Sequence, residues 1–439
     1  MNTKIDFIKG NTKKCLSAMV LPLLAAMFLN MAYNLVDSLW IGNLLGETAY
    51  AALTNSTPII LILSSIAMGA SNGISILLSQ AIGAEEKEKT DKIIMTSLVT
   101  AVIFSLGVTV LMEITLKPIL ILLNTPQEVM GLAYQYLAIY ILGYLSVYLY
   151  CYFTAVLRSF GNSIFQVAAM LICTFLNAVL DPVFIHFMGF NGAAAATVLS
   201  QTLCLILMLF YLHAKGFFHL HLPLFDKRLI IPLIAKGIPS AFQQSIPAIS
   251  TSFLTSLVTV YGISALAAYG ITGKLETILF YPAMALNMAL TSIVGQCAGG
   301  KRYDRAKDYI KLSLAYGIVV LFVLSGFVVL FARPLSHLFV DSSAAADIVV
   351  VYFKIVGIGY VLNTVTNCFL GSMNGMGRPA KSMLCMVLYY IIIRMPFAWL
   401  LSHSELGING IWTAVLISHL IAAAAAAAAA VHELLKRDL

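Results

Sequence analysis

The stretch Thr174-Phe-Leu-Asn177-Ala-Val-Leu-Asp181-Pro182 places a carboxylate inside a long apolar segment. An ionised aspartate is costly in such surroundings and is usually functional. On a helix, Thr174, Asn177 and Asp181 fall at positions i, i+3 and i+7, so the three side chains share one face. The amide of Asn177 can donate or accept a hydrogen bond one turn from the carboxylate. This pattern predicts a polar stripe that can hold a proton or a small cation.

The composition around this stretch is that of a polytopic membrane protein. Of the 439 residues, 60% are hydrophobic and 10% charged, and the mean hydropathy is +0.93, whereas soluble domains carry about 25% charged residues. The seven cysteines lie singly in or beside apolar runs, which favours packing over metal or disulfide roles. Twelve segments can each cross about 30 Å of hydrocarbon, at 16–40, 50–82, 93–116, 131–157, 163–186, 190–214, 231–260, 265–297, 309–332, 347–373, 379–402 and 407–432.

The positions of the basic residues predict the orientation of these twelve segments. Lys117 and Arg333 fall on the side opposite the N-terminus, and Lys274, Lys354 and Arg394 fall within segments. All the other Lys and Arg residues, Arg158 included, are assigned to the side of the N-terminus. The positive-inside rule therefore predicts a plasma-membrane protein with both termini in the cytoplasm. This topology accounts for the net charge of +7 without a nucleic-acid partner.

An internal repeat divides the chain into two halves. Gln80-Ala-Ile-Gly83 matches Gln296-Cys-Ala-Gly299, and Asn191-Gly192 matches Asn409-Gly410. The offset stays between 216 and 218 residues, which indicates two six-helix bundles. We expect a first bundle over residues 1–216, a cytoplasmic linker over 217–236, and a second bundle over 237–439. The fold class is therefore an all-α polytopic membrane protein of twelve transmembrane helices in two pseudo-symmetric bundles.

Two acidic residues within apolar segments are the main functional candidates in the first half. Asp37 ends a stripe with Asn30 and Asn34 on the first segment, just as Asp181 ends a stripe on the fifth. Both segments run outward, so the two carboxylates are predicted to lie at similar depth. Such a pair indicates a site for a coupling ion. The alternative for each is a residue at a helix end that reaches the outer interface.

The fourth segment carries a tyrosine at every fourth position. Such a stripe can line a cavity and present hydroxyls and π faces to a cationic substrate. The alternative is that these rings pack between helices. The stripe comprises Tyr136, Tyr140, Tyr144, Tyr148 and Tyr152.

The second half has different polar residues at the equivalent places. Its counterpart of the fifth segment contains Arg394 instead of the Asn/Asp pair. Glu276 is expected to pair with a cation on another helix, for which Lys354 is the candidate. A structural ion pair and a substrate-binding carboxylate both remain open for Glu276. The chain contains no P-loop, HExxH or metal-ligand motif, so an enzyme is not expected.

These features together resemble the multidrug and toxic compound extrusion (MATE) family, closest to its DinF-type branch. The resemblance rests on the repeat, on Asp37 and Asp181, on Gly192-Ala-Ala-Ala-Ala-Thr197, and on Gln296-Cys-Ala-Gly-Gly-Lys-Arg-Tyr-Asp-Arg305. It implies an antiporter with a V-shaped central cleft that exports organic, mostly cationic lipophilic compounds in exchange for H⁺ or Na⁺ by alternating access. The cation-coupling residues would be Asp37, Asp181, Asn177, Thr197 and Tyr136, with Na⁺ as a possible ion at the first four.

The resemblance also gives a set of expectations about ligands and partners. No cofactor is expected besides the coupling ion, and the protein is expected to be a monomer in the bilayer. A related flippase for lipid-linked oligosaccharides is the alternative, and a channel or sensor is a more distant one. The substrate cleft is expected to include Asn30, Asn34, Tyr140, Tyr144, Gln243, Glu276 and Asn363.

Overall fold

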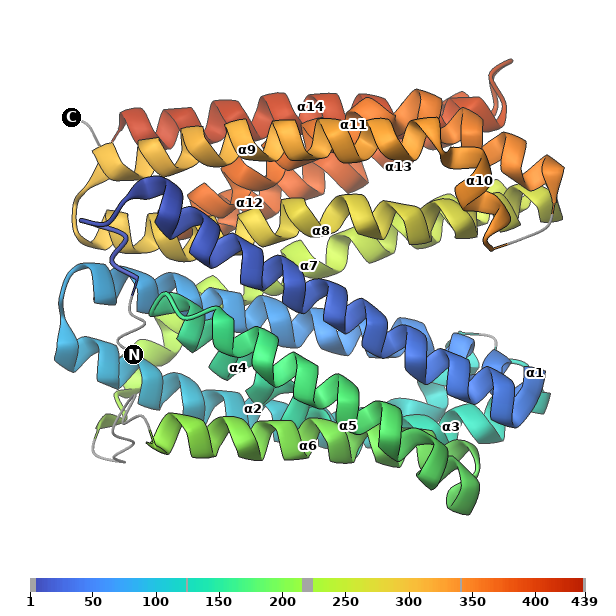
Figure 1. Ribbon diagram of the computed structural model, residues 1–439, viewed down its shortest axis with the longest axis horizontal. Helices are drawn as coiled ribbons and strands as arrows, with labels where there is room; N and C mark the ends of the chain where they lie inside the picture. The colour runs from blue at the N-terminus through green and yellow to red at the C-terminus, as the bar shows by residue number, and fades with distance from the viewer. Residues whose placement is uncertain (1–4, 124, 215–223, 340–341, 437–439) are drawn as a thin grey trace. The chain divides into compact units, whose positions relative to one another are not determined.

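The computed structural model describes residues 5–123, 125–214, 224–339 and 342–436, and within them the fold is helical without strands. Hydrocarbon offers no hydrogen bonds, so apolar segments satisfy their backbone groups within helices. Figure 1 shows the helices running roughly along a common direction within each half. They are α1 (Thr12–Gly83), α2 (Lys87–Leu122), α3 (Gln127–Leu142), α4 (Tyr144–Ser159), α5 (Ile164–Met188), α6 (Phe190–Ala214), α7 (Ile230–Thr259), α8 (Ile263–Gly299), α9 (Tyr303–Leu330), α10 (Ala332–His337), α11 (Ser343–Gly375), α12 (Pro379–Met386), α13 (Met395–Ser402) and α14 (Ile408–Leu435).

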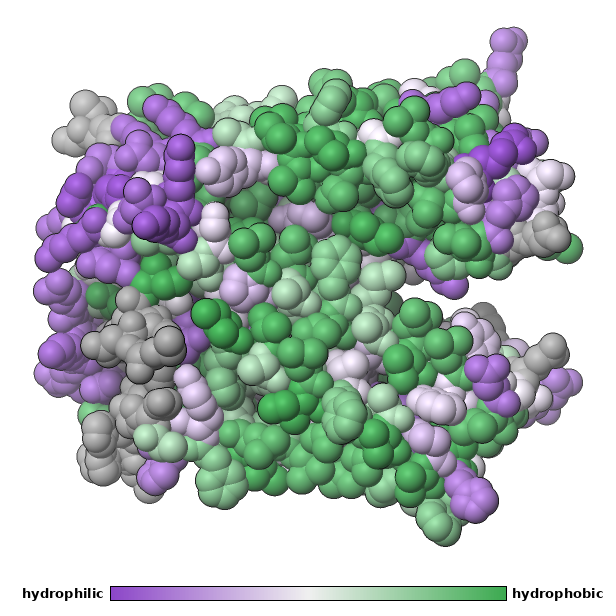
Figure 2. Space-filling view, viewed as in Figure 1, coloured by the Kyte–Doolittle hydropathy of each residue, from purple (hydrophilic) through white to green (hydrophobic). Residues whose placement is uncertain are grey.

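The predicted transmembrane segments appear with two irregularities. In the described part of the chain, ten helical segments are long and apolar enough to span a membrane, and α3 with α4 forms an eleventh that bends by 47°. The fourth predicted segment is thus bent at Gly143 rather than straight. The helix α7 covers the remaining predicted segment. In Figure 2 the long sides of the helices are mostly hydrophobic, and hydrophilic residues gather at their ends, as membrane helices require.

The chain forms two compact units, one of residues 1–5 and 21–241 and the other of 6–20 and 242–439. Each unit has its own hydrophobic core. The division falls inside α1 and inside α7, so it differs from the predicted boundaries at 216 and 237. Of the predicted linker, residues up to 223 lie outside the described residues. Its second part contains a short 3-10 helix, η2 (Lys227–Leu229), and the start of α7.

The twofold repeat is visible in the backbone itself. All eight described residues with positive φ fall into four pairs that are 216 to 218 positions apart. A positive φ ends or sharply turns a helix and favours glycine, so the repeat preserves the places where the chain turns. The pairs are Gly46 and Gly262, Glu85 and Lys301, Gly161 and Gly377, and Gly189 and Gly407.

Arg158 lies in the last turn of α4. Arg158 is 2% exposed at the end of α4, and its guanidinium donates to the side-chain oxygen of Asn72 at 3.5 Å. Arg158 is therefore packed within the protein at the end of α4.

Small residues let α1 and α7 approach closely in the first unit. A Cβ atom at Gly73 would lie 2.6 Å from the Cα of Gly237, and one at Gly69 would overlap the backbone of Ala241. Both pairs have the four-residue spacing typical of close helix packing in membranes. The contact places the first turns of α7 directly on the second half of α1.

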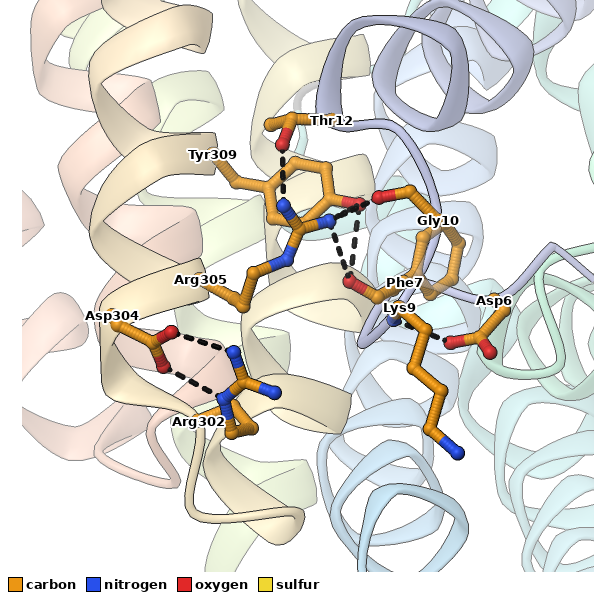
Figure 3. A network of polar contacts seen from close by, with 9 residues as sticks. All are labelled: Asp6, Phe7, Lys9, Gly10, Thr12, Arg302, Asp304, Arg305 and Tyr309. Atoms are coloured by element: carbon orange, nitrogen blue, oxygen red, sulfur yellow. Dashed lines mark hydrogen bonds and ion pairs between the residues drawn. The ribbon is translucent and has the colours of Figure 1, made fainter.

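The N-terminal segment is held to the second unit mainly by one arginine. Arg305 of α9 donates to the Thr12 hydroxyl at 2.7 Å and to the carbonyls of Phe7 and Gly10. Phe7 is fully buried, and its carbonyl also accepts a hydrogen bond from the Tyr309 hydroxyl at 3.1 Å. In Figure 3 the guanidinium of Arg305 points into this turn, whereas Arg302 points away and pairs with Asp304. Arg305 thus holds the start of the chain to α9.

The close contact between α1 and α7 predicts that Gly73→Ala destabilises the protein. The added methyl group must push the two helices apart, and overpacking of this kind costs about 1–3 kcal/mol. We expect the apparent Tm of the purified protein in detergent to fall by several degrees. Gly107→Ala is the control, because a Cβ atom at Gly107 of α2 meets nothing within 4 Å. Equal melting temperatures for the two variants would contradict the close approach.

The contacts of Arg305 predict that Arg305→Ala frees the N-terminal segment. Loss of several hydrogen bonds to a charged group should increase cleavage by endoproteinase Lys-C at Lys9, Lys13 and Lys14 by about tenfold. Mass spectrometry of the time course would measure this rate. Arg302→Ala should cleave as wild type does, because its ion pair with Asp304 is exposed and contributes little. If both variants behave alike, Arg305 does not hold the segment.

Candidate functional site

The fifth helix presents Asn177 and Asp181 on its buried face. Both side chains are fully buried, and Asn177 Nδ2 donates to Asp181 Oδ1 at 2.9 Å. The buried positions of α5 recur about once per turn and also include Cys173 and Ile185. Thr174 is half-buried and donates to the backbone of Met170. The stripe predicted from the sequence is therefore present, with Asn177 and Asp181 as its buried polar members.

The first helix presents Asp37, but the neighbours on its buried face differ from those predicted. Tyr33, Asp37 and Ile41 follow each other at four-residue spacing and are buried. Asn30 and Asn34 are exposed, and the amide of Asn34 donates to the Asn30 side chain and backbone. The two asparagines lie on the flank of the helix because their positions are rotated from the Tyr33–Asp37 line.

The two carboxylates meet inside the first unit. The side chains of Asp37 and Asp181 lie close enough to interact electrostatically. Tyr33 lies close to Thr197 and Ser200 of α6, and Tyr136 lies close to both aspartates. The ring of Tyr136 stacks on Phe190 with centroids 4.7 Å apart. Helices α1, α3, α5 and α6 therefore contribute side chains to one buried place.

This place contains several oxygens that lack protein partners. With both carboxyls ionised, five buried side-chain oxygens have no hydrogen-bond partner among the described residues. Buried polar atoms are seldom left in this state. The atoms are Tyr33 Oη, Asp37 Oδ1, Asn177 Oδ1, Asp181 Oδ2 and Thr197 Oγ1.

The chemistry of this donor set suits a hard cation or a proton. Carboxylate, amide and hydroxyl oxygens are the ligands that hard cations prefer. Two carboxylates in contact repel each other unless a proton or a cation lies between them. No group of three or more His, Cys, Asp or Glu residues that could hold a transition metal occurs in the described part of the chain. This group of oxygens can therefore bind a cation or a proton, which neutralises part of its negative charge.

The tyrosine stripe is mostly used for packing between helices. The bend at Gly143 divides it between α3 and α4, and all five tyrosines are buried. The Tyr144 hydroxyl donates to the carbonyl of Leu63 at 3.1 Å, and that of Tyr152 to the carbonyl of Ile94 at 2.7 Å. Tyr140 is also buried, in the last turn of α3. Of the stripe, only Tyr136 lies beside both aspartates.

The candidates of the second half have separate environments. Gln243 exchanges hydrogen bonds with Asn374 at 3.1 and 3.3 Å and donates to the carbonyl of Pro379. Asn363 is buried, and its backbone carbonyl accepts from Asn367 at 3.0 Å. Within the second unit, Gln243 therefore tethers α7 to the end of α11 and the start of α12.

The expected pairing of Glu276 with Lys354 is wrong. The carboxylate of Glu276 accepts hydrogen bonds from the hydroxyls of Tyr352 and Tyr360. The cation that interacts with it electrostatically is Arg394. Lys354 is exposed. It is two residues from Tyr352, and side chains at this spacing point to different sides of a helix. Lys274 lies over the ring of Phe339 at 5.1 Å.

Sequence reasoning missed two functional candidates. Tyr33 was overlooked because the stripe on the first helix was traced through the asparagines, although Tyr33 lies one turn before Asp37. Arg394 was noted only as a departure from the repeat, although a buried arginine in a span is itself a functional signal. The sequence signals are the four-residue spacing from Tyr33 to Asp37 and the lone arginine at Arg394 in an apolar segment, but neither shows which helix face is buried.

Comparison with known proteins agrees with this architecture. A family model described as MatE matches the chain twice, over residues 22–183 and 239–400, which confirms the internal repeat. The probable multidrug resistance protein YpnP of Bacillus subtilis is 29% identical over 428 residues, covering 95% of this chain and 94% of that protein. The FAD transporter of Shewanella oneidensis is 26% identical, covering 96% and 95%.

Solved structures give the same fold. One, described as the outward-facing conformation of a multidrug resistance MATE family transporter, matches with a TM-score of 0.94. The match covers 100% of this chain and 99% of that one at 22% sequence identity. At this identity the match establishes the fold, with its twelve transmembrane helices. Together with the family model, which covers most of the chain, it shows that this protein is a multi-pass membrane transporter of the MatE family.

Proposed function

We propose that this protein exports organic compounds, mostly lipophilic cations, in exchange for H⁺ or Na⁺ by alternating access. The observation that carries the proposal is the group of five unpartnered buried oxygens around Asp37 and Asp181. The relatives described as multidrug resistance proteins support the substrate class. The chain would lie in the plasma membrane as a monomer with both termini in the cytoplasm and would need no cofactor besides the coupling ion.

The coupling follows from the charge of the site. With both carboxyls ionised, the first unit carries buried negative charge that attracts a cationic substrate. Binding of a proton or Na⁺ reduces this charge by one, so substrate and ion are favoured by different states of the same site. Mutually exclusive binding of this kind links the two fluxes. Asn177 fixes the orientation of Asp181 through its hydrogen bond.

The roles of the other residues follow from their positions. Tyr33 and Thr197 would complete the oxygen set from α1 and α6, and Tyr136 would close one side of it. The two units, each with its own core, would act as the moving bodies. The bundles predicted over residues 1–216 and 237–439 would then correspond to these bodies, apart from the helices α1 and α7 that the units divide.

The first test is replacement of the carboxylates. In proteoliposomes, Asp37→Asn and Asp181→Asn should each reduce gradient-driven uptake of ethidium at least tenfold, because neither variant can lose and regain the full negative charge. Separate pH and Na⁺ gradients would identify the coupling ion. Glu128→Gln is the matched control, since it removes an exposed carboxylate at the start of α3. If Asp37→Asn takes up ethidium at the wild-type rate under either gradient, the proposal is wrong.

The second test concerns Tyr33. Tyr33→Phe removes one oxygen of the set and keeps the ring, so the concentration of coupling ion that gives half-maximal transport should shift by about tenfold. Tyr134→Phe serves as control, because Tyr134 is 39% exposed. Initial rates of ethidium uptake as a function of ion concentration would measure the shift. An unchanged ion dependence would exclude Tyr33 from the site.

A further inference from the structure

The second unit contains a polar cavity that the proposed ion site does not use. Its volume is about 60 Å³, and its wall combines one carboxylate and one guanidinium with aromatic rings. Residues from α7, α8, α11 and the segment after α12 contribute to it. Those used below are Thr251, Tyr269, Glu276, Tyr352, Tyr390 and Arg394.

The carboxylate of Glu276 is only half satisfied by the protein. Its Oε1 atom accepts hydrogen bonds from the hydroxyls of Tyr352 and Tyr360. Its second oxygen, Oε2, makes no hydrogen bond to any described residue, and Glu276 lines the cavity. Glu276 therefore offers the cavity a negatively charged acceptor held in place by two phenols.

Arg394 is held in place just as firmly and is 6% exposed. Its Nε donates to the Ser418 hydroxyl at 2.9 Å and its Nη2 to the Tyr389 hydroxyl at 2.9 Å. The guanidinium carbon lies 4.7 and 4.5 Å from the ring centroids of Tyr389 and Tyr390. The other terminal nitrogen, Nη1, has no hydrogen-bond partner among the described residues. Arg394 therefore offers the cavity a fixed cation with free donors.

A π-helical stretch creates this arrangement. Residues Val387–Arg394 form η3, between α12 and α13. In a π-helix the backbone hydrogen bonds span five residues instead of four, so Tyr389 and Arg394, five positions apart, lie closer to one face than they would in an α-helix. Such stretches are frequent at functional sites. The twin segment of the first unit, α5, has no such stretch.

Glu276 and Arg394 share the cavity without forming a direct ion pair. If the two charges served only to stabilise the fold, they would be expected to form a direct ion pair, because an unpaired charge in a membrane bundle is costly. Here the two charges face one small space with aromatic walls. A volume of this size holds a group of a few non-hydrogen atoms. The group that matches both charges carries a cation and an anion close together.

We propose that this cavity binds the zwitterionic end of a transported compound, such as an α-ammonium carboxylate. The carboxylate of the ligand lies on Arg394, and its ammonium group lies between Glu276 and the rings of Tyr269 and Tyr352. The inference rests on the proposed export function and widens its substrates beyond lipophilic cations. The apolar body of the compound extends past Thr251.

Three matched fluorescent probes test this assignment. Nε-dansyl-lysine carries the free zwitterion, its methyl ester carries only the cation, and its Nα-acetyl derivative carries only the anion. Binding is measured by dansyl fluorescence with the protein in nanodiscs and no ion gradient. The wild type should bind the zwitterion at least tenfold more tightly than either derivative, because each charge pair contributes a charge-assisted hydrogen bond.

The variants should change this preference in opposite ways. Arg394→Gln should abolish the preference over the methyl ester and keep that over the acetyl derivative, and Glu276→Gln should do the reverse. Lys354→Gln, at an exposed position of α11, should leave both preferences intact. Thr251→Trp narrows the cavity from an exposed position and should weaken zwitterion binding at least tenfold, even if the Arg394 variant does not fold.

The outcomes separate this inference from the proposed function. Equal binding of the three probes to the wild type, or a preference that survives both Arg394→Gln and Thr251→Trp, overturns the zwitterion site. Binding is measured without transport, so a protein that discriminates the probes but fails to move ethidium contradicts only the export proposal. A protein that exports ethidium but does not discriminate contradicts only the zwitterion site.

Discussion

Every backbone group in the hydrocarbon layer must be satisfied by the chain itself, and the rest of this fold depends on that constraint. It forces long helices, and it makes each interruption costly enough to need a reason. The bend at Gly143 brings Tyr136 beside the aspartates while Tyr144 and Tyr152 pack between helices. The π-helical stretch before α13 brings Tyr389 and Arg394 to one face. Irregular backbone and functional side chains therefore occur together.

The two halves keep the same turns but contain different chemistry. The positive-φ residues recur at equivalent positions, whereas the Asn177–Asp181 pair of α5 has no equivalent in the second half. There, the corresponding segment contributes Arg394. A duplicated frame constrains where helices begin and end, but it leaves the buried polar positions of each half free to differ. The same architecture can thus hold an ion site on one side of the repeat and a site of mixed charge on the other.

The helices and the repeat could be predicted because hydrophobic length and glycine positions are local signals. The closeness of Asp37 and Asp181 could also be anticipated, because each aspartate ends a polar stripe in its predicted segment. The partner of Glu276 could not, since Tyr352 and Lys354 differ only by a rotation that depends on how α11 packs. The place of Tyr33 and the π-helical turn before α13 likewise depend on tertiary packing. Sequence periodicity locates helices well, but it does not fix which face of each helix is buried.

The docking of the N-terminal segment sets an order of events during synthesis. Thr12 and its partner Arg305 are separated by 293 positions. At about 5–20 residues per second, the first turn of the protein waits roughly 15 to 60 s before α9 is made. During that time Phe7 cannot reach its buried position, and α1 must stay inserted without its final anchor. Residues 6–20 can therefore join the second unit only after α9 has been made, while α11 and α14 are still to follow.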